Sequence, residues 1–157
     1  MRAVSRAAPS FSIAAAAPDD AAAIGALLRA ADLPAEDFAD HLAHFLVARA
    51  GGAVVGAVGF ERHGRAALLR SLVVAPARRG AGLGDALVRR LAARARRAGV
   101  DRFYLLTTTA EAFFARRGFA KIARGEVPAA IAGTREFQSL CPVSAVCMTR
   151  TVGVRQP

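Results

Sequence analysis

The chain has 157 residues, 54% of them hydrophobic, so it can bury one continuous core but leaves no room for a second independent domain. Its net charge of +10 would ordinarily suggest a nucleic-acid or membrane partner, yet Lys121 is the only lysine among 22 basic residues. That arginine excess indicates a compositional bias of the whole chain, and we expect no specific nucleic-acid partner and no membrane partner. Cys141 and Cys147 are too few for a disulfide framework, so reduced thiols in a cytoplasmic protein are expected.

The N-terminal region combines basic residues with a short alanine-rich run, a pattern superficially like that of a signal peptide. Pro9, Ser10 and Ser12 interrupt the run, so a targeting role is not expected. Residues 10–16 are instead predicted as an edge strand. No apolar stretch of the sequence approaches the ~18 residues that a membrane span requires.

The first half of the chain alternates helix signals with short strands. Pro18-Asp19-Asp20 predicts a helix start, because acidic side chains stabilise the positive end of the helix dipole. Leu33-Pro34 ends that helix, and residues 35–38 begin a short helical piece expected near a substrate mouth. Strands are predicted over 45–48, 53–60 and 66–74, with turns at Gly51-Gly52 and His63-Gly64.

The second half is dominated by one long helix. Apolar residues recur at helical spacing between residues 82 and 98, and Gly99 is placed to cap the helix. The arginine cluster on this helix is predicted to be a solvated face rather than a nucleic-acid site. Strands are predicted over 103–106, 119–123 and 143–151, with a short helix over 110–116.

The sequence contains no internal repeat and no linker, which indicates a single domain. Antiparallel hairpins followed by a strand–helix–strand crossover indicate a mixed α/β sheet with flanking helices. We expect a single domain over residues 10–151 between flexible termini at 1–9 and 152–157, either monomeric or homodimeric.

A glycine-rich turn between the strand ending at Val74 and the long helix is the most informative segment. Glycines let successive backbone N–H groups converge on one point, and the first turn of a helix adds unpaired donors and a positive dipole end. An anion is therefore expected there, with Arg79 adding charge. Taken alone, the turn is equally typical of a steric solution to a tight strand-to-helix connection.

The order of residues in this turn, Arg79-x-x-Gly82-x-Gly84 after a branched strand, resembles the acetyl-CoA signature of the GNAT superfamily of N-acetyltransferases. The dinucleotide-binding fingerprint and the P-loop lysine are both missing. A second segment resembles the family's helix beside CoA: Thr107-x-x-Ala110-x-x-Phe113-Phe114-x-x-x-Gly118-Phe119. The resemblance covers roughly residues 10–151 and implies a mostly antiparallel GNAT-like fold with acetyl-CoA as co-substrate.

The resemblance also implies roles for particular positions. The backbone of the strand would hold the pantetheine arm and the thioester carbonyl, with the amide of Val74 or Leu72 as the oxyanion donor. Residues 79–85 would hold the pyrophosphate. The complete set of implied CoA-binding residues is Leu72, Val73, Val74, Arg79, Gly80, Ala81, Gly82, Leu83, Gly84, Asp85, Thr107 and Phe114.

Two of these positions depart from the family pattern. Thr107 stands where the family often has Asn, and Phe114 stands where a Tyr usually protonates the departing CoA thiolate. Phe114 has no proton to give. Either solvent protonates the thiolate, whose thiol has a reference pKa of ~8.5, or Tyr104 or another group takes over.

Three further segments, residues 69–72, 105–110 and 134–142, resemble a GNAT branch associated with arsenic-resistance operons and related to amino-acid N-acetyltransferases. This resemblance implies an amino-acid-like primary amine as acceptor, including a toxic glutamate analogue that bears arsenic or phosphorus. No residue recognises arsenic directly. The alternatives are acetylation of a protein or peptide amine, and a CoA-binding module that has lost catalysis.

Candidate catalytic and acceptor-binding residues come from charged side chains in apolar surroundings. Glu61 is predicted either as the general base or as an exposed strand-end carboxylate paired with Arg62 or Arg65, and Glu136 is the second candidate base. Arg70 interrupts an apolar strand, and an arginine there needs either a partner acid or a ligand.

We predict that Arg70 binds an acceptor carboxylate, with Arg135 as the second candidate. Alternation along a strand would place Arg70, Leu72 and Val74 on one face, and Glu61 would join them if the hairpin turn has two residues. His41 and His44 have no third ligand in view, so no metal is predicted.

Overall fold

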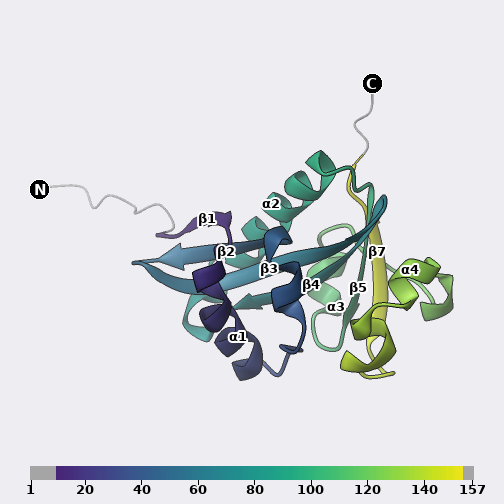
Figure 1. The fold of residues 1–157 in the computed structure, drawn as a ribbon, viewed down its shortest axis with the longest axis horizontal. Coiled ribbons are helices and arrows are strands. Elements are labelled where there is room, and N and C mark those ends of the chain that lie inside the picture. The colour runs from purple at the N-terminus through teal and green to yellow at the C-terminus, as the bar shows by residue number, and fades with distance from the viewer. Residues whose placement is uncertain (1–9, 154–157) are drawn as a thin grey trace, which may run out of the picture.

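The computed structural model describes residues 10–153 and shows a seven-stranded sheet in the order β1-β2-β3-β4-β5-β7-β6 (Figure 1). The termini predicted to be flexible, residues 1–9 and 154–157 of the C-terminal segment, lie outside the described residues. The strands are β1 (Ser12–Ala15), β2 (Phe45–Ala50), β3 (Ala53–His63), β4 (Ala66–Val74), β5 (Arg102–Thr107), β6 (Ala120–Lys121) and β7 (Val146–Thr151). All neighbours are antiparallel except β4 and β5, which confirms the predicted mixed sheet.

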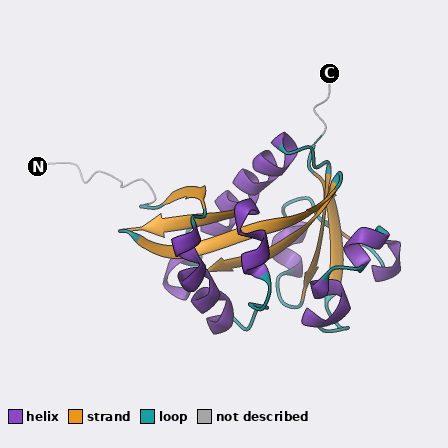
Figure 2. Cartoon of the chain, in the orientation of Figure 1, coloured by secondary structure: helices purple, strands orange, loops and turns teal. Residues whose placement is uncertain are grey.

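Helices cover both faces of the sheet (Figure 2). The α-helices are α1 (Ala21–Ala30), α2 (Leu83–Arg97), α3 (Glu111–Ala115) and α4 (Ala129–Ala132). Short 3₁₀ segments are η1 (Pro18–Asp20), η2 (Phe38–His44), η3 (Pro76–Arg78) and η4 (Arg124–Glu126), and η5 (Glu136–Leu140) is a π-helical turn. None of the helices in residues 10–153 is long and apolar enough to cross a bilayer.

Two apolar layers follow from the alternation of side chains in the central strands. Leu46 and Ala48 of β2 belong to the larger core cluster beneath α2. Phe45 and Val47 belong to a second cluster beneath α1 and η2. Because successive strand residues point to opposite faces, α1 and α2 pack on opposite sides of the sheet, as Figure 1 shows. Each layer is closed by its own amphipathic helix.

The two parallel strands at the centre of the sheet separate soon after they meet. β4 and β5 pair from Ala66 with Arg102 to Leu68 with Tyr104, and among the described residues no further pairing joins them. β5 continues in register with β7 as far as Thr107, while β4 stays with β3. One edge of β4 is therefore open beyond Leu68, and a wedge-shaped gap lies between the strands.

A β-bulge interrupts β4 at Ser71, whose φ of 63° is left-handed. The register shifts there, because Gly59 pairs with Arg70 but Ala57 pairs with Val73. The bulge overturns the predicted alternation. Arg70 lies on the α1 side, whereas Leu72 and Val74 pack with the cluster beneath α2.

The β3–β4 hairpin has the two-residue turn on which the Glu61 prediction depended, since His63 pairs with Ala66. Glu61 therefore shares a face with Arg70. The strand runs on to His63, so Glu61 lies inside β3 rather than at its end, and it is buried. Its predicted alternative as an exposed, strand-end carboxylate is wrong for this reason.

Most predicted elements are present, with differences at the C-terminal end. β4 and α2 match the predicted ranges closely. The strand predicted over 119–123 is reduced to the two residues of β6, and β7 begins three residues later than predicted, at Val146. The sequence patterns missed α4 and η5, which are each about one turn long and too short to show helical periodicity.

Candidate functional site

A cavity of about 910 Å³ occupies the gap between the diverging ends of β4 and β5. Its walls include the open edge of β4 and the start of α3, with the loop after α1 at one side and η5 at another. The lining residues are 30–34, 69–74, 105–110, 112–114 and 140–142, with Pro76, Arg79, Gly84, Arg116, Glu136 and Ala145. The loop after α1 thus lines the cavity with residues 30–34, whereas residues 35–38, the segment predicted to lie near a substrate mouth, are not among the lining residues.

At one end of the cavity, the glycine-rich turn leads into the first turn of α2. Gly80 and Gly82 have φ values of 84° and 83°, and Gly82 is the residue that precedes the helix. Non-glycine residues rarely adopt this conformation, so the turn depends on these glycines. Arg79 folds back, and its Nε donates to the Val74 carbonyl oxygen at 3.1 Å. The turn leaves the amino end of a fifteen-residue helix exposed beside β4.

The same helix turn is braced against α3 by Asp85. Arg117 Nε donates to Asp85 Oδ1 at 3.0 Å, and its guanidinium lies 3.6 Å from the centre of the Phe113 ring. Hydrogen bonding from Arg89, with the charge of Arg117, lowers the pKa of Asp85 despite partial desolvation. Phe113 in turn lies so close to Gly84 that a Cβ atom there would be 3.3 Å from the ring. Asp85 therefore fixes the two helices that flank the cavity.

The structure brings some of the predicted CoA-binding residues together in the cavity wall and leaves others outside it. Those in the wall are Leu72, Val73, Val74, Arg79, Gly84, Thr107 and Phe114. Gly80, Ala81 and Gly82 lie exposed in the turn, and Leu83 is buried in the core beneath α2. Any role of Leu83 toward a phosphate would be through its backbone.

At the other end of the cavity lies a buried cluster of one cation and three carboxylates. The Arg70 side chain is fully buried and contacts Asp37, Glu61 and Glu136, at N–O distances of 2.5, 3.3 and 3.4 Å respectively. A second contact to Asp37, from Nη1 at 3.2 Å, makes that pair bidentate. Asp37 immediately precedes η2, Glu61 lies in β3, and Glu136 is the first residue of η5.

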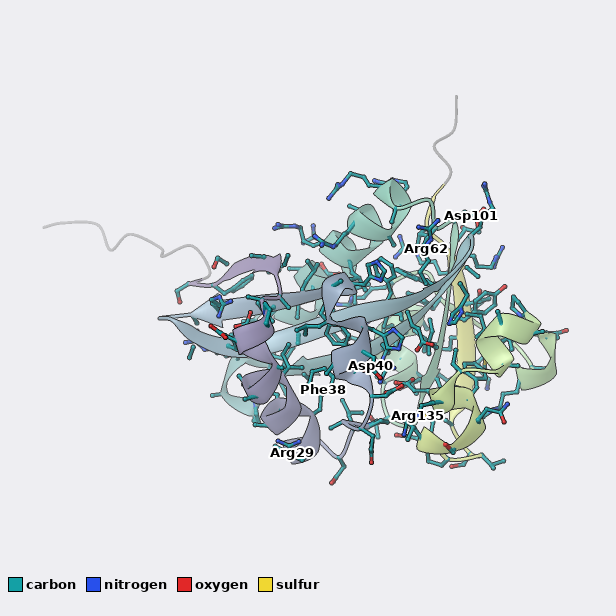
Figure 3. All side chains as sticks on the ribbon, in the orientation of Figure 1. Arg29, Phe38, Asp40, Arg62, Asp101 and Arg135 are labelled. Carbon is teal, nitrogen blue, oxygen red and sulfur yellow. The ribbon has the colours of Figure 1, made fainter. Side chains whose placement is uncertain are left out.

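This arrangement does not leave Arg70 free for an acceptor carboxylate. An arginine in an apolar strand was predicted to need either a ligand or partner acids, and here the chain supplies the acids. Arg135, the second candidate, is exposed at the start of η5 and does not line the cavity (labelled in Figure 3). Burial would raise the pKa of Asp37, but Arg70, with smaller help from Arg135 and His41, brings it below its usual value.

Glu136 and Glu61, the two predicted bases, contact different nitrogen atoms of Arg70, Nε and Nη1 respectively. Glu136 is buried and lines the cavity, whereas Glu61 does not line it. Burial raises the pKa of Glu136 to about 7 against the opposing charge of Arg70, and the Asp37 and Glu61 carboxylates add to the rise. A carboxyl group with a pKa near neutrality exchanges protons readily at physiological pH, so this position is suited to general-base chemistry.

Two other groups clarify which residues can move protons in the cavity. Cys141 lines it, with Sγ 3.8 Å from Glu136 Oε1, a position that the sequence analysis did not predict. Burial and the charge of Glu136 raise the pKa of Cys141 to about 12, so the thiol stays protonated. Tyr104, a predicted substitute acid, packs with Leu68 and Ile131 and does not line the cavity.

Asp37, His41 and Glu61 each present one possible metal-ligand atom, and these atoms lie within 4.8 Å of one another. Asp37 and Glu61 are both paired with Arg70. The guanidinium charge opposes a metal cation at that point, so the group is explained as an ion-pair network. His44, the second histidine considered in the sequence, is not part of this group, and its ring stacks on Phe60 with ring centres 4.5 Å apart.

Comparison with known proteins connects this geometry to a family. The family model described as "Acetyltransferase (GNAT) domain" matches residues 41–121, which are 81 of the 157 residues. The amino-acid acetyltransferase of Ralstonia nicotianae is 32% identical over 89 residues, which are 55% of this chain and 20% of that protein. The chain thus spans about a fifth of the length of this curated relative.

Solved structures share the fold over most of the chain. A Mycobacterium tuberculosis protein in complex with CoA has a TM-score of 0.77 and 27% identity, covering 89% of this chain and 98% of that one. N-acetylglutamate synthase from Neisseria gonorrhoeae, complexed with coenzyme A and N-acetyl-glutamate, has a TM-score of 0.81 and 22% identity. That match covers 92% of this chain and 35% of the synthase.

Proposed function

Because the chain belongs to the GNAT acetyltransferase family, we propose that it transfers an acetyl group from acetyl-CoA to the primary amine of a small, amino-acid-like acceptor. The observation that carries this proposal is one cavity that combines an open strand edge, a helix amino end and a buried carboxyl of near-neutral pKa. The amino-acid acetyltransferase relatives support the class of acceptor.

Acetyl-CoA is the co-substrate, and the cavity offers it backbone groups. The open edge of β4 from Leu69 to Val74 can pair with the amide groups of the pantetheine arm in the manner of an added strand. The turn at residues 79–85 and the first turn of α2 would hold the pyrophosphate through backbone N–H groups and the helix dipole. The amide of Val74 or Leu72 then serves the thioester oxygen as an oxyanion donor.

Glu136 is the group that we assign as general base. The acceptor enters as an ammonium ion, and Glu136 takes one of its protons so that the nitrogen lone pair can attack the thioester carbon. The C–N bond forms, the nitrogen releases its second proton to solvent, and the tetrahedral intermediate collapses as the C–S bond breaks with its electron pair remaining on sulfur. Glu61 lies behind Arg70, away from the cavity lining, and so is less well placed for this step.

The departing thiolate needs a proton. Phe114 lines the cavity but has no proton to give, and Tyr104 does not line the cavity. The thiol of CoA is more acidic than Cys141, whose pKa is about 12, so proton transfer from Cys141 would be uphill. The proton held by Glu136 after attack can return to the thiolate, which restores the carboxylate for the next turnover. Solvent is the other source.

The finer identity of the acceptor rests on the resemblance of residues 69–72, 105–110 and 134–142 to the arsenic-resistance branch. It points to a glutamate analogue bearing arsenic or phosphorus. Arg135 is the proposed partner of an acceptor carboxylate, because Arg70 is already committed to three acids. An exposed guanidinium at the start of η5 can still form a bidentate pair.

The experiment is a transfer assay with acetyl-CoA against the amino acids, their phosphorus and arsenic analogues, and a peptide with a free N-terminus. Glu136→Gln should lower kcat by about 10²–10⁴-fold with little change in the KM for acetyl-CoA. In the wild type, kcat/KM should rise with pH through about 7, where Glu136 ionises.

Glu126→Gln is the matched control, because Glu126 is exposed on η4 and away from the cavity lining. Full activity of Glu136→Gln would remove the base assignment. A peptide that outperforms every amino acid would replace the proposed acceptor class.

A further inference from the structure

We propose that Arg70 is a positioning residue shared among three carboxylates, and that Asp37 and Glu61 control how strongly it holds the base Glu136. The proposal rests on the proposed function only in naming Glu136 as the base. It goes beyond that function because it gives Asp37 and Glu61 a role in setting the protonation of Glu136, although neither of them lines the cavity.

The three carboxylates make unequal contacts with the Arg70 guanidinium. Asp37 receives the two short contacts, at 2.5 and 3.2 Å, in the bidentate geometry that strengthens such pairs. Glu61 receives a single contact at 3.3 Å, and Glu136 receives the longest, 3.4 Å from Nε. Nε also donates to the Ser71 hydroxyl oxygen at 3.3 Å. Among the described residues, Glu136 is thus in ion-pair contact with Nε but, unlike Asp37 and Glu61, receives no hydrogen bond from Arg70.

The charge balance points the same way. Three carboxylates and one guanidinium leave an excess of negative charge in a buried cluster, and like charges close together cannot all remain ionised at low cost. A proton is best placed on the acid that Arg70 holds least, which is Glu136. The pKa of about 7 for Glu136 and the lowered pKa of Asp37 agree with this division.

Titratable and charged groups from several other segments surround the cluster. Cys141 faces Glu136 from the segment after η5, and Arg135 acts on Asp37 from the start of η5. His41 Nε2 of η2 lies 3.5 Å from Glu61, and His63 Nε2 of β3 lies 3.0 Å from it. Neither histidine lines the cavity. The titration of Glu136 is therefore coupled to the whole network.

A purely mechanical role for the same residues would have different consequences. If Arg70 merely tied these segments together, loss of Asp37 would loosen the fold and would lower the pKa of Glu136 only through the removal of one nearby negative charge. If the guanidinium is shared, loss of one competing acid lets Arg70 turn toward Glu136 and removes a nearby negative charge. Both effects favour ionised Glu136.

The test is a ¹³C NMR pH titration of the Glu136 side-chain carboxyl in the full chain labelled with ¹³C-glutamate, with the resonance assigned by its absence in Glu136→Gln. Asp37→Asn should lower the midpoint by about one pH unit, the lower end of the range for the effect of a neighbouring charge. Glu61→Gln should lower it by less. Asp101→Asn, which breaks the exposed pair with Arg65, is the control and should leave the midpoint unchanged.

An unchanged midpoint in folded Asp37→Asn would overturn the proposal. Should that variant fail to fold, Glu61→Gln decides alone, and an unchanged or raised midpoint in it overturns the proposal equally. The NMR titration uses no substrate, so its outcome does not depend on whether the proposed function is right. A midpoint that moves while the acid limb of kcat/KM stays fixed would support the sharing of Arg70 and would remove Glu136 as base.

Discussion

The two ends of the cavity are built from different parts of the chain and by different kinds of groups. The end that we propose for CoA, the CoA end, is built mainly on one continuous stretch, residues 72–85, which offers backbone groups on a strand edge and a helix end. The end that we propose for the acceptor, the acceptor end, brings together Asp37, Glu61, Arg70 and Glu136 from separate parts of the chain, and it offers side-chain charge. A backbone site is disturbed only when the conformation of the chain changes, whereas a buried charge cluster is disturbed by a single truncation.

The largest expected difference between the two ends concerns stability. Arg70→Ala leaves three buried carboxylates without their cation, so the free energy of unfolding should fall by about 3–5 kcal/mol. Chemical denaturation at pH 7.5 measures the change. Arg65→Ala removes an arginine from an exposed pair with Asp101 and should cost about 0–1 kcal/mol. Equal losses in the two variants would mean that the acceptor end contributes no more than a surface contact.

The CoA end should respond to a change of conformation rather than of charge. Gly82→Val places a branched residue at a φ of 83°, so the turn should move and CoA affinity should fall by at least about tenfold, or 1.4 kcal/mol. Calorimetric titration with CoA measures the effect. Gly51→Val is matched to it, because Gly51 has a φ of 59° in a hairpin turn that does not line the cavity. Unchanged CoA affinity in Gly82→Val would remove the pyrophosphate from this turn.

The smallest expected effect belongs to the exposed edge of the acceptor end. Arg135→Ala should raise the KM for an amino-acid acceptor by about threefold, the scale of an exposed ion pair, and the effect should shrink in 1 M salt. Steady-state kinetics with the best acceptor, and with the corresponding amine that lacks its carboxylate, separates charge recognition from packing. A KM that rises equally for both acceptors would show that Arg135 does not bind the carboxylate.

Local patterns in the sequence predicted the structural elements around the proposed CoA end well, because each of these elements depends on neighbouring residues. The range of β4, the glycine turn and the length of α2 all follow from apolar spacing and turn chemistry within residues 66–99. The bulge at Ser71 was not predicted. Serine is not a strong signal for a left-handed residue, and the bulge depends on the register between β3 and β4.

The sequence by itself determined that this chain forms a mixed sheet with a glycine turn at the start of a long helix, and it singled out Arg70, Glu61 and Glu136 as unusual charges. Only the tertiary structure decided which ion-pair partners those charged groups have. Ion pairing between residues 37, 61, 70 and 136 is non-local, since it depends on how β3, β4, η2 and η5 pack. Burial then selects the protonated acid, because desolvation acts on the folded position of a group rather than on its neighbours in sequence.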